Sequence, residues 1–419
     1  MVEDTLTRRL YEQIARIPIR DPHTHISPHS PAARSLDEIL GYHYYTELAH
    51  SAGMSHEPLA QGYPPAERCR VLLRYLERFD NTVQVAWLVE TAQTFLDFPK
   101  SRISEADADW LWEKAEQVMS APDWHNQVLA RSGIELVFLT NDFDDPLQGF
   151  DTRLYVPCLR TDELVFRLHQ SAVRQRLAQV TNIEVGNLKQ LREALDRLFR
   201  RFVQHGTRAC AISLPPDFTP SLPPPDLSLP LDTPSPELSQ QVFWMLAECC
   251  RDYRLPFDLM IGVHRGVYRH GVYQGQDLFD QRTSLWQYRE LFNAFPQVTF
   301  CVSVLSSSQN PELVAYAWIF PNVVCNGHWW YSNLPGLIAH DLAARLQGVP
   351  KTKILGYYSD AYKLEFVLPK FNMFRRVLAQ VLAEDYVRGR GWSEDAAVQL
   401  ARQILYDNIA SIFPPPEPN

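Results

Sequence analysis

Ile17-Pro-Ile-Arg-Asp-Pro-His-Thr-His25 is a short apolar run that ends in two histidines one residue apart. Side chains alternate faces along an extended chain, so His23 and His25 point the same way and can bind one metal ion. Two histidines at a strand end can equally be ordinary hydrogen-bonded polar groups. Their position favours the metal site, because parallel α/β folds place their chemistry at this end of their strands. Asp360, at the end of the last apolar run, can supply a third ligand.

The composition is that of an ordinary globular protein. Of 419 residues, 46% are hydrophobic and 21% charged, and the length suits two or three domains or one large α/β barrel. A net charge of -9 argues against a nucleic-acid partner, which would need clustered basic residues. We therefore expect a small-molecule partner.

Cysteine usage and the start of the chain indicate a reducing compartment. The cysteines number seven, an odd count without paired CxxC spacing, so neither a disulfide framework nor a cysteine zinc site is indicated. The first ten residues contain no apolar core of a signal peptide, and no apolar stretch is long enough to cross a membrane. We expect a cytoplasmic protein without a membrane partner. The number of subunits stays open, a homo-oligomer included.

The remaining apolar runs predict the fold. Near-continuous apolar runs of strand length are typical of parallel strands that are buried on both faces. Together with 17–21 they make the eight strands of a closed (β/α)8 TIM barrel, an α/β fold. They span residues 17–21, 134–140, 154–159, 209–214, 257–263, 298–302, 323–326 and 354–358. Segments with helical periodicity lie between them, at 163–204, 237–252, 281–295, 335–347 and 366–385.

Residues 58–126 contain apolar positions at helical spacing and no convincing strand. They are predicted to form an α-helical insertion after the first strand. The barrel is then expected to be built from residues 1–57 and 127–419.

Polar side chains follow most of the predicted strands. They are His23, His25, Asn141, Asp142, Arg160, His264, Arg265, His328, Trp329 and Asp360. Two imidazoles and one carboxylate suit a divalent ion with positions left open for water or substrate; zinc fits best, with manganese as the alternative. The arginines suit a substrate carboxylate, which a guanidinium can hold through two parallel hydrogen bonds.

In their order along the chain, these residues resemble the uronate isomerases, a divergent sugar-acid branch of the amidohydrolase superfamily. The resemblance covers most of the chain, including the insertion after the first strand. Its motifs are Asp21-Pro-His-Thr-His-Ile-Ser-Pro28, His43-Tyr44, Thr140-Asn-Asp-Phe-Asp-Asp-Pro146, Val156-Pro-Cys-Leu-Arg-Thr-Asp162, Gly327-His-Trp-Trp-Tyr-Ser-Asn333, Ser359-Asp360 and Phe371-Asn-Met-Phe-Arg-Arg376.

The resemblance implies a role for each matched position. His23, His25 and Asp360 would bind the metal; His43, Tyr44 and Arg160 would contact an open-chain uronate, and Trp329 would line the pocket. The family interconverts aldose and ketose uronates, such as glucuronate and fructuronate, by moving a proton between C2 and C1 through an enediol. Asp360 is then the candidate base, and the metal or Tyr44 the candidate electrophile.

Three departures from the family pattern leave the reaction open. Cys210-Ala211-Ile212 replaces the family's Ser-Asp-His on strand four, Met260 replaces the strand-five histidine, and Asp360-Ala-Tyr362 replaces Asp-x-Arg. The downstream arginine is matched by Arg265.

Nearby side chains offer one explanation: His264, Tyr362 and Lys363 stand in for the missing groups, and the substrate is still a sugar acid. Alternatively, the scaffold keeps its metal but carries out hydrolysis or decarboxylation of another carboxylate. A third alternative, a non-catalytic ligand-binding protein, has no feature in its favour.

Overall fold

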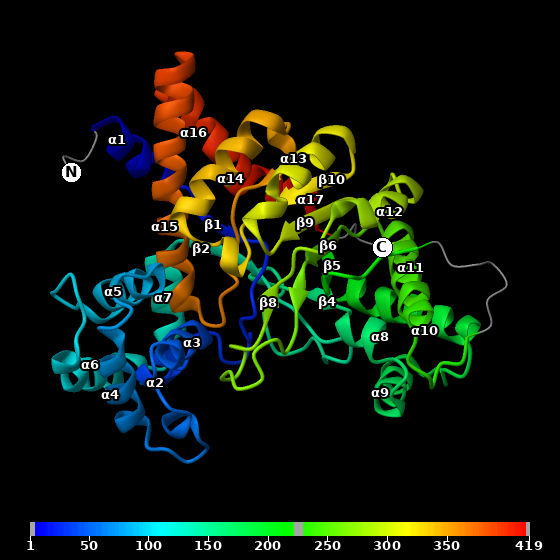
Figure 1. Ribbon diagram of the computed structural model, residues 1–419, viewed down its shortest axis with the longest axis horizontal. Coiled ribbons are helices and arrows are strands. Elements are labelled where there is room, and N and C mark those ends of the chain that lie inside the picture. Colours follow the sequence, from blue (N-terminus) through cyan, green and yellow to red (C-terminus); the bar gives the residue numbers. More distant parts are fainter. Residues whose placement is uncertain (1–4, 222–228, 416–419) are drawn as a thin grey trace.

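The computed structural model describes residues 5–221 and 229–415 and shows a closed parallel barrel wrapped by helices (Figure 1). Each barrel strand overlaps one of the predicted apolar runs, and neighbouring barrel strands pair in parallel. In chain order they are β1 (Ile19–Asp21), β2 (Ile134–Phe138), β3 (Tyr155–Val156) with β4 (Cys158–Arg160), β5 (Ala209–Leu214), β6 (Phe257–Ile261), β9 (Phe300–Val304), β10 (Val323–Asn326) and β11 (Ile354–Leu355). The predicted TIM barrel is confirmed.

Two local features complete the barrel. Pro157, which has no N–H to donate, divides the third strand into β3 and β4, and an isolated bridge between Asn141 and Leu159 links the two groups of strands. The last strand meets the first beyond their assigned ends. There the His25 N–H donates to the Ala361 carbonyl at 2.8 Å, and the Asp360 N–H donates to the His23 carbonyl at 3.2 Å.

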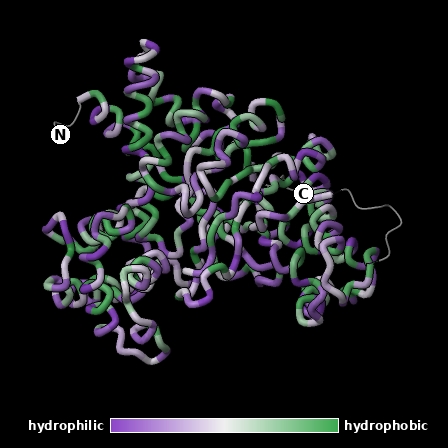
Figure 2. Tube along the Cα trace, in the orientation of Figure 1, coloured by the Kyte–Doolittle hydropathy of each residue, from purple (hydrophilic) through white to green (hydrophobic). Residues whose placement is uncertain are grey.

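Helices follow most barrel strands and pack their apolar sides against them. In Figure 2, hydrophobic and hydrophilic stretches alternate along these helices, as expected for amphipathic segments that cover a core. They are α8 (Asp162–Phe166), α9 (Ser171–Thr181), α10 (Leu188–Gln204), α11 (Pro236–Asp252), α12 (Arg289–Ala294), α13 (Asn310–Ile319), α14 (Pro335–Gly348), α15 (Val367–Val381), α16 (Glu394–Arg402) and α17 (Asn408–Ile412), preceded by α1 (Thr5–Ile14). None of the described helices combines the length and apolarity needed to cross a membrane.

The segment between the first two strands is helical. It contains α2 (Leu36–Leu40), α3 (His43–Ser51), α4 (Pro65–Leu76), α5 (Val83–Leu96), α6 (Ala108–Met119) and α7 (Trp124–Ser132). Ser35 caps α2 by accepting a hydrogen bond from the Glu38 N–H, as its sequence predicts. Side chains of α4 to α6, such as Leu73, Leu88 and Leu111, belong to the same buried cluster as the barrel helices. The insertion therefore packs onto the barrel rather than standing apart from it.

A short antiparallel hairpin interrupts the βα alternation after β6. It consists of β7 (Val263–His264) and β8 (Leu278–Phe279), and the loop between them lies over the C-terminal ends of the barrel strands. The sequence patterns did not predict this hairpin.

Candidate active site and metal centre

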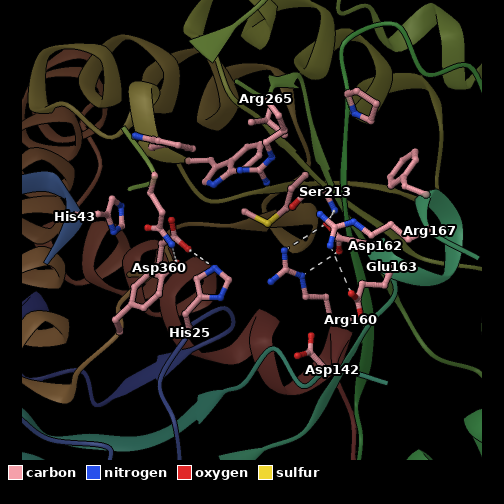
Figure 3. A pocket seen from close by; sticks show the side chains of 18 of the residues that line it. His25, His43, Asp142, Arg160, Asp162, Glu163, Arg167, Ser213, Arg265 and Asp360 are labelled. Atoms are coloured by element: carbon pink, nitrogen blue, oxygen red, sulfur yellow. Dashed lines mark hydrogen bonds and ion pairs between the residues drawn. The ribbon is translucent and has the colours of Figure 1, made fainter. Parts of the chain in front are cut away.

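A cavity of about 850 Å³ opens at the C-terminal ends of the barrel strands. Figure 3 shows His25, His43 and Asp360 on one side of it and Arg160, Asp162, Glu163 and Arg167 on the other. The lining residues are His25, His43, Asp142, Phe143, Arg160, Asp162, Glu163, Phe166, Arg167, Arg176, Ser213, Pro215, Met260, Val263, Arg265, Tyr273, Gln274, Trp329, Trp330, Asp360 and Tyr362.

The three predicted metal ligands converge at one side of this cavity. One ligand atom from each of His23, His25 and Asp360 lies within 4.8 Å of the others. Asp360 Oδ1 is 3.3 Å from His25 Nε2 and 3.6 Å from His23 Nε2. His23 Nε2 and Asp360 Oδ1 are buried and lack a hydrogen-bond partner among the described residues. A set of unpaired imidazole and carboxylate atoms that face one another fits a divalent cation.

The backbone holds these side chains in place. Asp360 has a φ of 53°, in the left-handed region that Asp tolerates better than bulky residues do. This conformation turns the chain just after β11. The buried carboxylate of Asp21 accepts a hydrogen bond from the Ser359 N–H at 3.0 Å, which ties this turn to the end of β1. The ligands from the first and last strands are thus fixed to each other.

The surroundings of the ligands lower the pKa of both Asp360 and His25, but for different reasons. Burial alone would raise the pKa of the Asp360 carboxyl, but the imidazoles of His25 and His23 outweigh burial and hold that pKa below its usual range. For His25, burial dominates and lowers the pKa of the imidazole. An ionised carboxylate and a neutral imidazole are the forms that bind a metal.

Lys370 supports the same turn from α15. Its buried ammonium donates to the Ser359 carbonyl at 2.8 Å and to the Tyr42 hydroxyl at 2.7 Å, and that hydroxyl donates to the Asp360 carbonyl at 3.1 Å. Burial lowers the pKa of Lys370 to about 8. Lys370 therefore holds the peptide groups on both sides of Asp360, one directly and the other through Tyr42.

Arginines and carboxylates line the opposite side of the cavity. Arg160 donates from Nε to Asp162 at 3.1 Å, and Arg265 donates to Asp277 at 2.6 Å. Arg176 is held between Asp144, at 2.6 Å, and Glu163, at 2.7 Å. Both Arg160 and Arg176 line the cavity, but Arg176 is fully engaged by two acids, whereas Arg160 contacts only the Asp162 carboxylate among the described residues. Arg160 is the better-placed cation for a substrate carboxylate.

Aromatic and polar groups lie between the two sides. The Tyr362 ring lies 4.9 Å from that of His25 and 5.4 Å from that of His43, and its hydroxyl accepts a hydrogen bond from Gln274 at 3.0 Å. Burial raises the pKa of Tyr362 to about 12 and lowers the pKa of His43 to about 3. At neutral pH the Tyr362 hydroxyl can therefore donate a hydrogen bond, and the neutral His43 imidazole can accept one. Trp329 forms part of the wall.

Three of the residues expected to act on the substrate, Tyr44, His264 and Lys363, do not line the cavity. Tyr44 is buried behind His43 against Trp87, because its position on α3 turns it inward. His264 points out of the barrel and pairs with Asp280 at 3.1 Å. Lys363 forms an ion pair with Glu38 at 2.8 Å. Of the three candidate replacements for the missing family groups, only Tyr362 lines the cavity.

Several polar groups around the site were not predicted from the sequence patterns. Asp258 is a buried acid within the apolar run of β6, and Lys370 is a buried cation in an apolar helix. A charge inside an apolar pattern is the signal that could have identified both, because buried charges need partners. Gln274 carried no such signal, since it sits in a polar loop.

Taken together, the fold and the site define a (β/α)8-barrel enzyme whose site suits a divalent metal. The sequence model of the glucuronate isomerase family matches residues 1–221, more than half of the chain, and the chain therefore belongs to that family. It is an enzyme of the uronate isomerase type. Its matches are mainly to isomerases and so do not favour the hydrolase or decarboxylase alternative.

Individual relatives agree over nearly the full length. The uronate isomerase of Thermotoga neapolitana is 22% identical over 97% of this chain and 96% of its own. The crystal structure of uronate isomerase from Thermotoga maritima superposes with a TM-score of 0.87 at 20% identity, over 97% of both chains. Glucuronate isomerase from Caulobacter crescentus gives a TM-score of 0.88 at 18% identity, over 98% of this chain and 95% of its own. At these identities the two structures support the fold.

Proposed function

We propose that the chain interconverts an aldose and a ketose hexuronate, of the glucuronate and fructuronate type, with a divalent ion held by His23, His25 and Asp360. The observation that carries the proposal is the convergence of these three ligand atoms at the edge of a cavity that Arg160 also lines. Family membership supplies the reaction class. Zinc is the proposed ion, with manganese as the alternative, because two imidazoles and one carboxylate leave positions open for substrate oxygens.

The reaction moves a proton between C2 and C1 of the open-chain sugar through an enediol. A bound divalent ion would supply Lewis-acid stabilisation for the negative charge that develops on the carbonyl oxygen. Asp360 is the proposed base. Because its Oδ1 faces both imidazoles, Oδ2 is the oxygen left to accept the proton from one carbon and return it to the other. A carboxylate that also binds a metal is a weakened base, so close positioning against the substrate must compensate.

Neighbouring side chains would orient the substrate. The neutral His43 imidazole can accept a hydrogen bond from a sugar hydroxyl, and the Tyr362 hydroxyl can donate one. Tyr362 takes the electrophile's position that the resemblance assigned to Tyr44, because Tyr362 lines the cavity and Tyr44 does not. Arg160 is proposed to bind the substrate carboxylate, with Arg265 near it and Trp329 as an apolar wall.

The direct test is turnover of candidate uronates. The purified chain, loaded with Zn²⁺ or Mn²⁺, is incubated with glucuronate and with galacturonate in D₂O, and the ketose is followed by NMR. We expect ketose formation together with deuterium at the carbon that receives the proton, because an enediol route exchanges with solvent. Absence of turnover with both metals and both sugars would contradict the proposal, and a parallel panel of lactones and acyl carboxylates would then identify a hydrolase.

A further inference from the structure

Asp258 is a buried carboxylate in the middle of a barrel strand. It lies on β6 in the run Phe257-Asp-Leu-Met-Ile261, and only 3% of its surface is exposed. Placing a carboxylate in such surroundings costs several kcal/mol unless it is paired and hydrogen-bonded. Its partners therefore indicate why the chain keeps it there.

Those partners are a proposed metal ligand and an amide. Asp258 Oδ2 lies 3.4 Å from His23 Nδ1. Asp258 Oδ1 accepts a hydrogen bond from Asn326 Nδ2, on β10, at 3.0 Å. Asp258 does not line the cavity, and the nearby side chains of Ala211 and Cys301 offer it no charge. Its contact with the proposed metal ligands, within residues 5–221 and 229–415, is the one with the His23 ring at Nδ1.

The two nitrogens of His23 have different surroundings. Nδ1 faces the Asp258 carboxylate, whereas Nε2 faces Asp360 Oδ1 and is buried without a hydrogen-bond partner in the described parts of the chain. An acceptor at Nδ1 favours the tautomer with its proton there, which leaves the Nε2 lone pair directed at the ligand group. The same contact restricts rotation of the ring.

The strand pattern explains why this acid appears in this chain. Asp258 and Met260 lie two residues apart on β6 and therefore share its inward face. Met260 lines the cavity at the position of the family histidine, while Asp258 lies one layer deeper. The polar group of β6, the fifth barrel strand, is thus Asp258, and it lies behind the proposed ligand His23 rather than beside the substrate cavity.

We propose that Asp258, anchored by Asn326, is a positioning residue that sets the tautomer and orientation of His23 for metal binding. This inference rests on the proposed metal site and goes beyond it, because neither residue touches the metal or the substrate.

Metal affinity without substrate provides the test. Asp258→Asn keeps the shape and removes the charge, and Asn326→Leu removes the donor that anchors Asp258. The Zn²⁺ dissociation constant is measured by competition with a chelator at fixed pH, and the visible spectrum of the Co²⁺-loaded protein reports ligand geometry. We expect Asp258→Asn to weaken Zn²⁺ binding about 10- to 100-fold and to shift the Co²⁺ bands. Asn326→Leu should act in the same direction with a smaller effect.

Asp341→Asn is the matched control. Asp341 is also a fully buried carboxylate, but it lies on α14 and accepts a hydrogen bond from Ser307. The Asp341→Asn substitution should leave the Zn²⁺ affinity unchanged. Wild-type affinity in a folded Asp258→Asn protein would overturn the proposal, as would failure of both test variants to fold, since Asp258 would then serve core stability instead.

The outcome separates this inference from the proposed function. If the parent protein binds Zn²⁺ and the variants respond as expected, but no uronate turns over, then only the proposed reaction fails. If uronates turn over and the Asp258→Asn variant binds Zn²⁺ normally, then only the positioning role fails.

Discussion

Asp360 has a strained backbone conformation, and its carboxylate lies beside the imidazoles of His23 and His25. Its φ of 53° is uncommon for a residue other than glycine, and such strain persists where surrounding contacts fix it. Those contacts are hydrogen bonds from Tyr42 to its carbonyl and from its own N–H to His23. The strain at Asp360 lowers the stability of the fold, and the same conformation places the carboxylate beside the two histidines that follow β1. This is the arrangement expected of a residue that acts in the chemistry rather than in the core.

The position of Arg160 predicts how its substitution changes substrate binding. Arg160→Met should raise the KM for glucuronate roughly 10- to 150-fold, the equivalent of about 1.5–3 kcal/mol for a charged hydrogen-bond partner, with a smaller effect on kcat. Arg153→Met is the matched control, because Arg153 also pairs with an aspartate two residues away, Asp151, but is 90% exposed at the surface. Steady-state kinetics on both variants measure the effect. Equal KM values for Arg160→Met and the parent would assign Arg160 a structural role.

Residue types at strand ends could be predicted, and for His23 and His25 also the direction of the side chains, but for Tyr44 and His264 that direction could not. His23, His25 and Asp360 follow from strand alternation and from the position of the runs, and they converge as expected. Tyr44 and His264 were selected by the same sequence order, yet a helix rotation buries one and a hairpin turns the other outward. Neither the orientation of α3 nor the turn of the hairpin can be deduced from the spacing of apolar residues.

At the scale of elements, the contact between Gly327 and Tyr358 fixes the loop that carries Trp329. Gly327 has a φ of 48°, and a Cβ there would lie 2.2 Å from the Tyr358 ring. That ring packs 5.2 Å from the His23 ring, between centroids. Only glycine allows the loop after β10 to approach the last strand so closely, and the wall of the site depends on this approach.

Gly327→Ala should therefore destabilise the fold by at least about 1–3 kcal/mol, the usual cost of overpacking, with backbone strain in addition. Gly336→Ala is the control, because Gly336 lies at the start of α14 with no atom in the path of a Cβ. That change should be neutral or slightly stabilising. Urea unfolding compares the two, and an equally stable Gly327→Ala protein would show that the loop can move without cost.

The barrel strands could be predicted from the sequence, whereas one helix and one hairpin could not. Most barrel strands were found because they lie in nearly continuous apolar runs that are buried on both faces, such as β9 and β10. Helix α13 was not predicted. Trp318 and Ile319 are 67% and 71% exposed, and these exposed apolar side chains obscure the helical periodicity of the segment. The β7–β8 hairpin was not predicted because β8 is an isolated pair of exposed residues rather than part of a longer buried run. Exposed apolar residues and very short strands give no reliable period.

At the scale of the whole molecule, Glu365 ties together three segments distant in sequence. It lies just after the turn at Asp360, and its Oε1 accepts hydrogen bonds from the Ala33 N–H at 2.9 Å and from Trp124 Nε1 at 2.8 Å. Its other oxygen is buried and has no hydrogen-bond partner among the residues that the structure describes. Burial raises the pKa of Glu365 from 4.5 to about 7. The protonated form is thus favoured in the folded chain.

This shift predicts a pH-dependent stability. Because the folded chain binds the proton more tightly than the unfolded chain, the stabilisation is complete below about pH 4.5 and is lost as the pH rises through about 7. The free energy of unfolding of the parent, minus that of Glu365→Gln, should fall by roughly 3 kcal/mol across this range. Denaturant titrations at several pH values measure it, with Glu116→Gln, an exposed position on α6, as control. A pH-independent difference would rule out a proton on Glu365.

The metal content of His23→Ala, compared with that of the parent and of His29→Ala, tests the central claim most directly. His29 lies six residues further along the same loop but outside the ligand group. Elemental analysis after purification in Zn²⁺ should find stoichiometric metal in the parent and in His29→Ala, and little in His23→Ala, which should also fail to convert glucuronate. Equal metal in all three proteins would contradict the account.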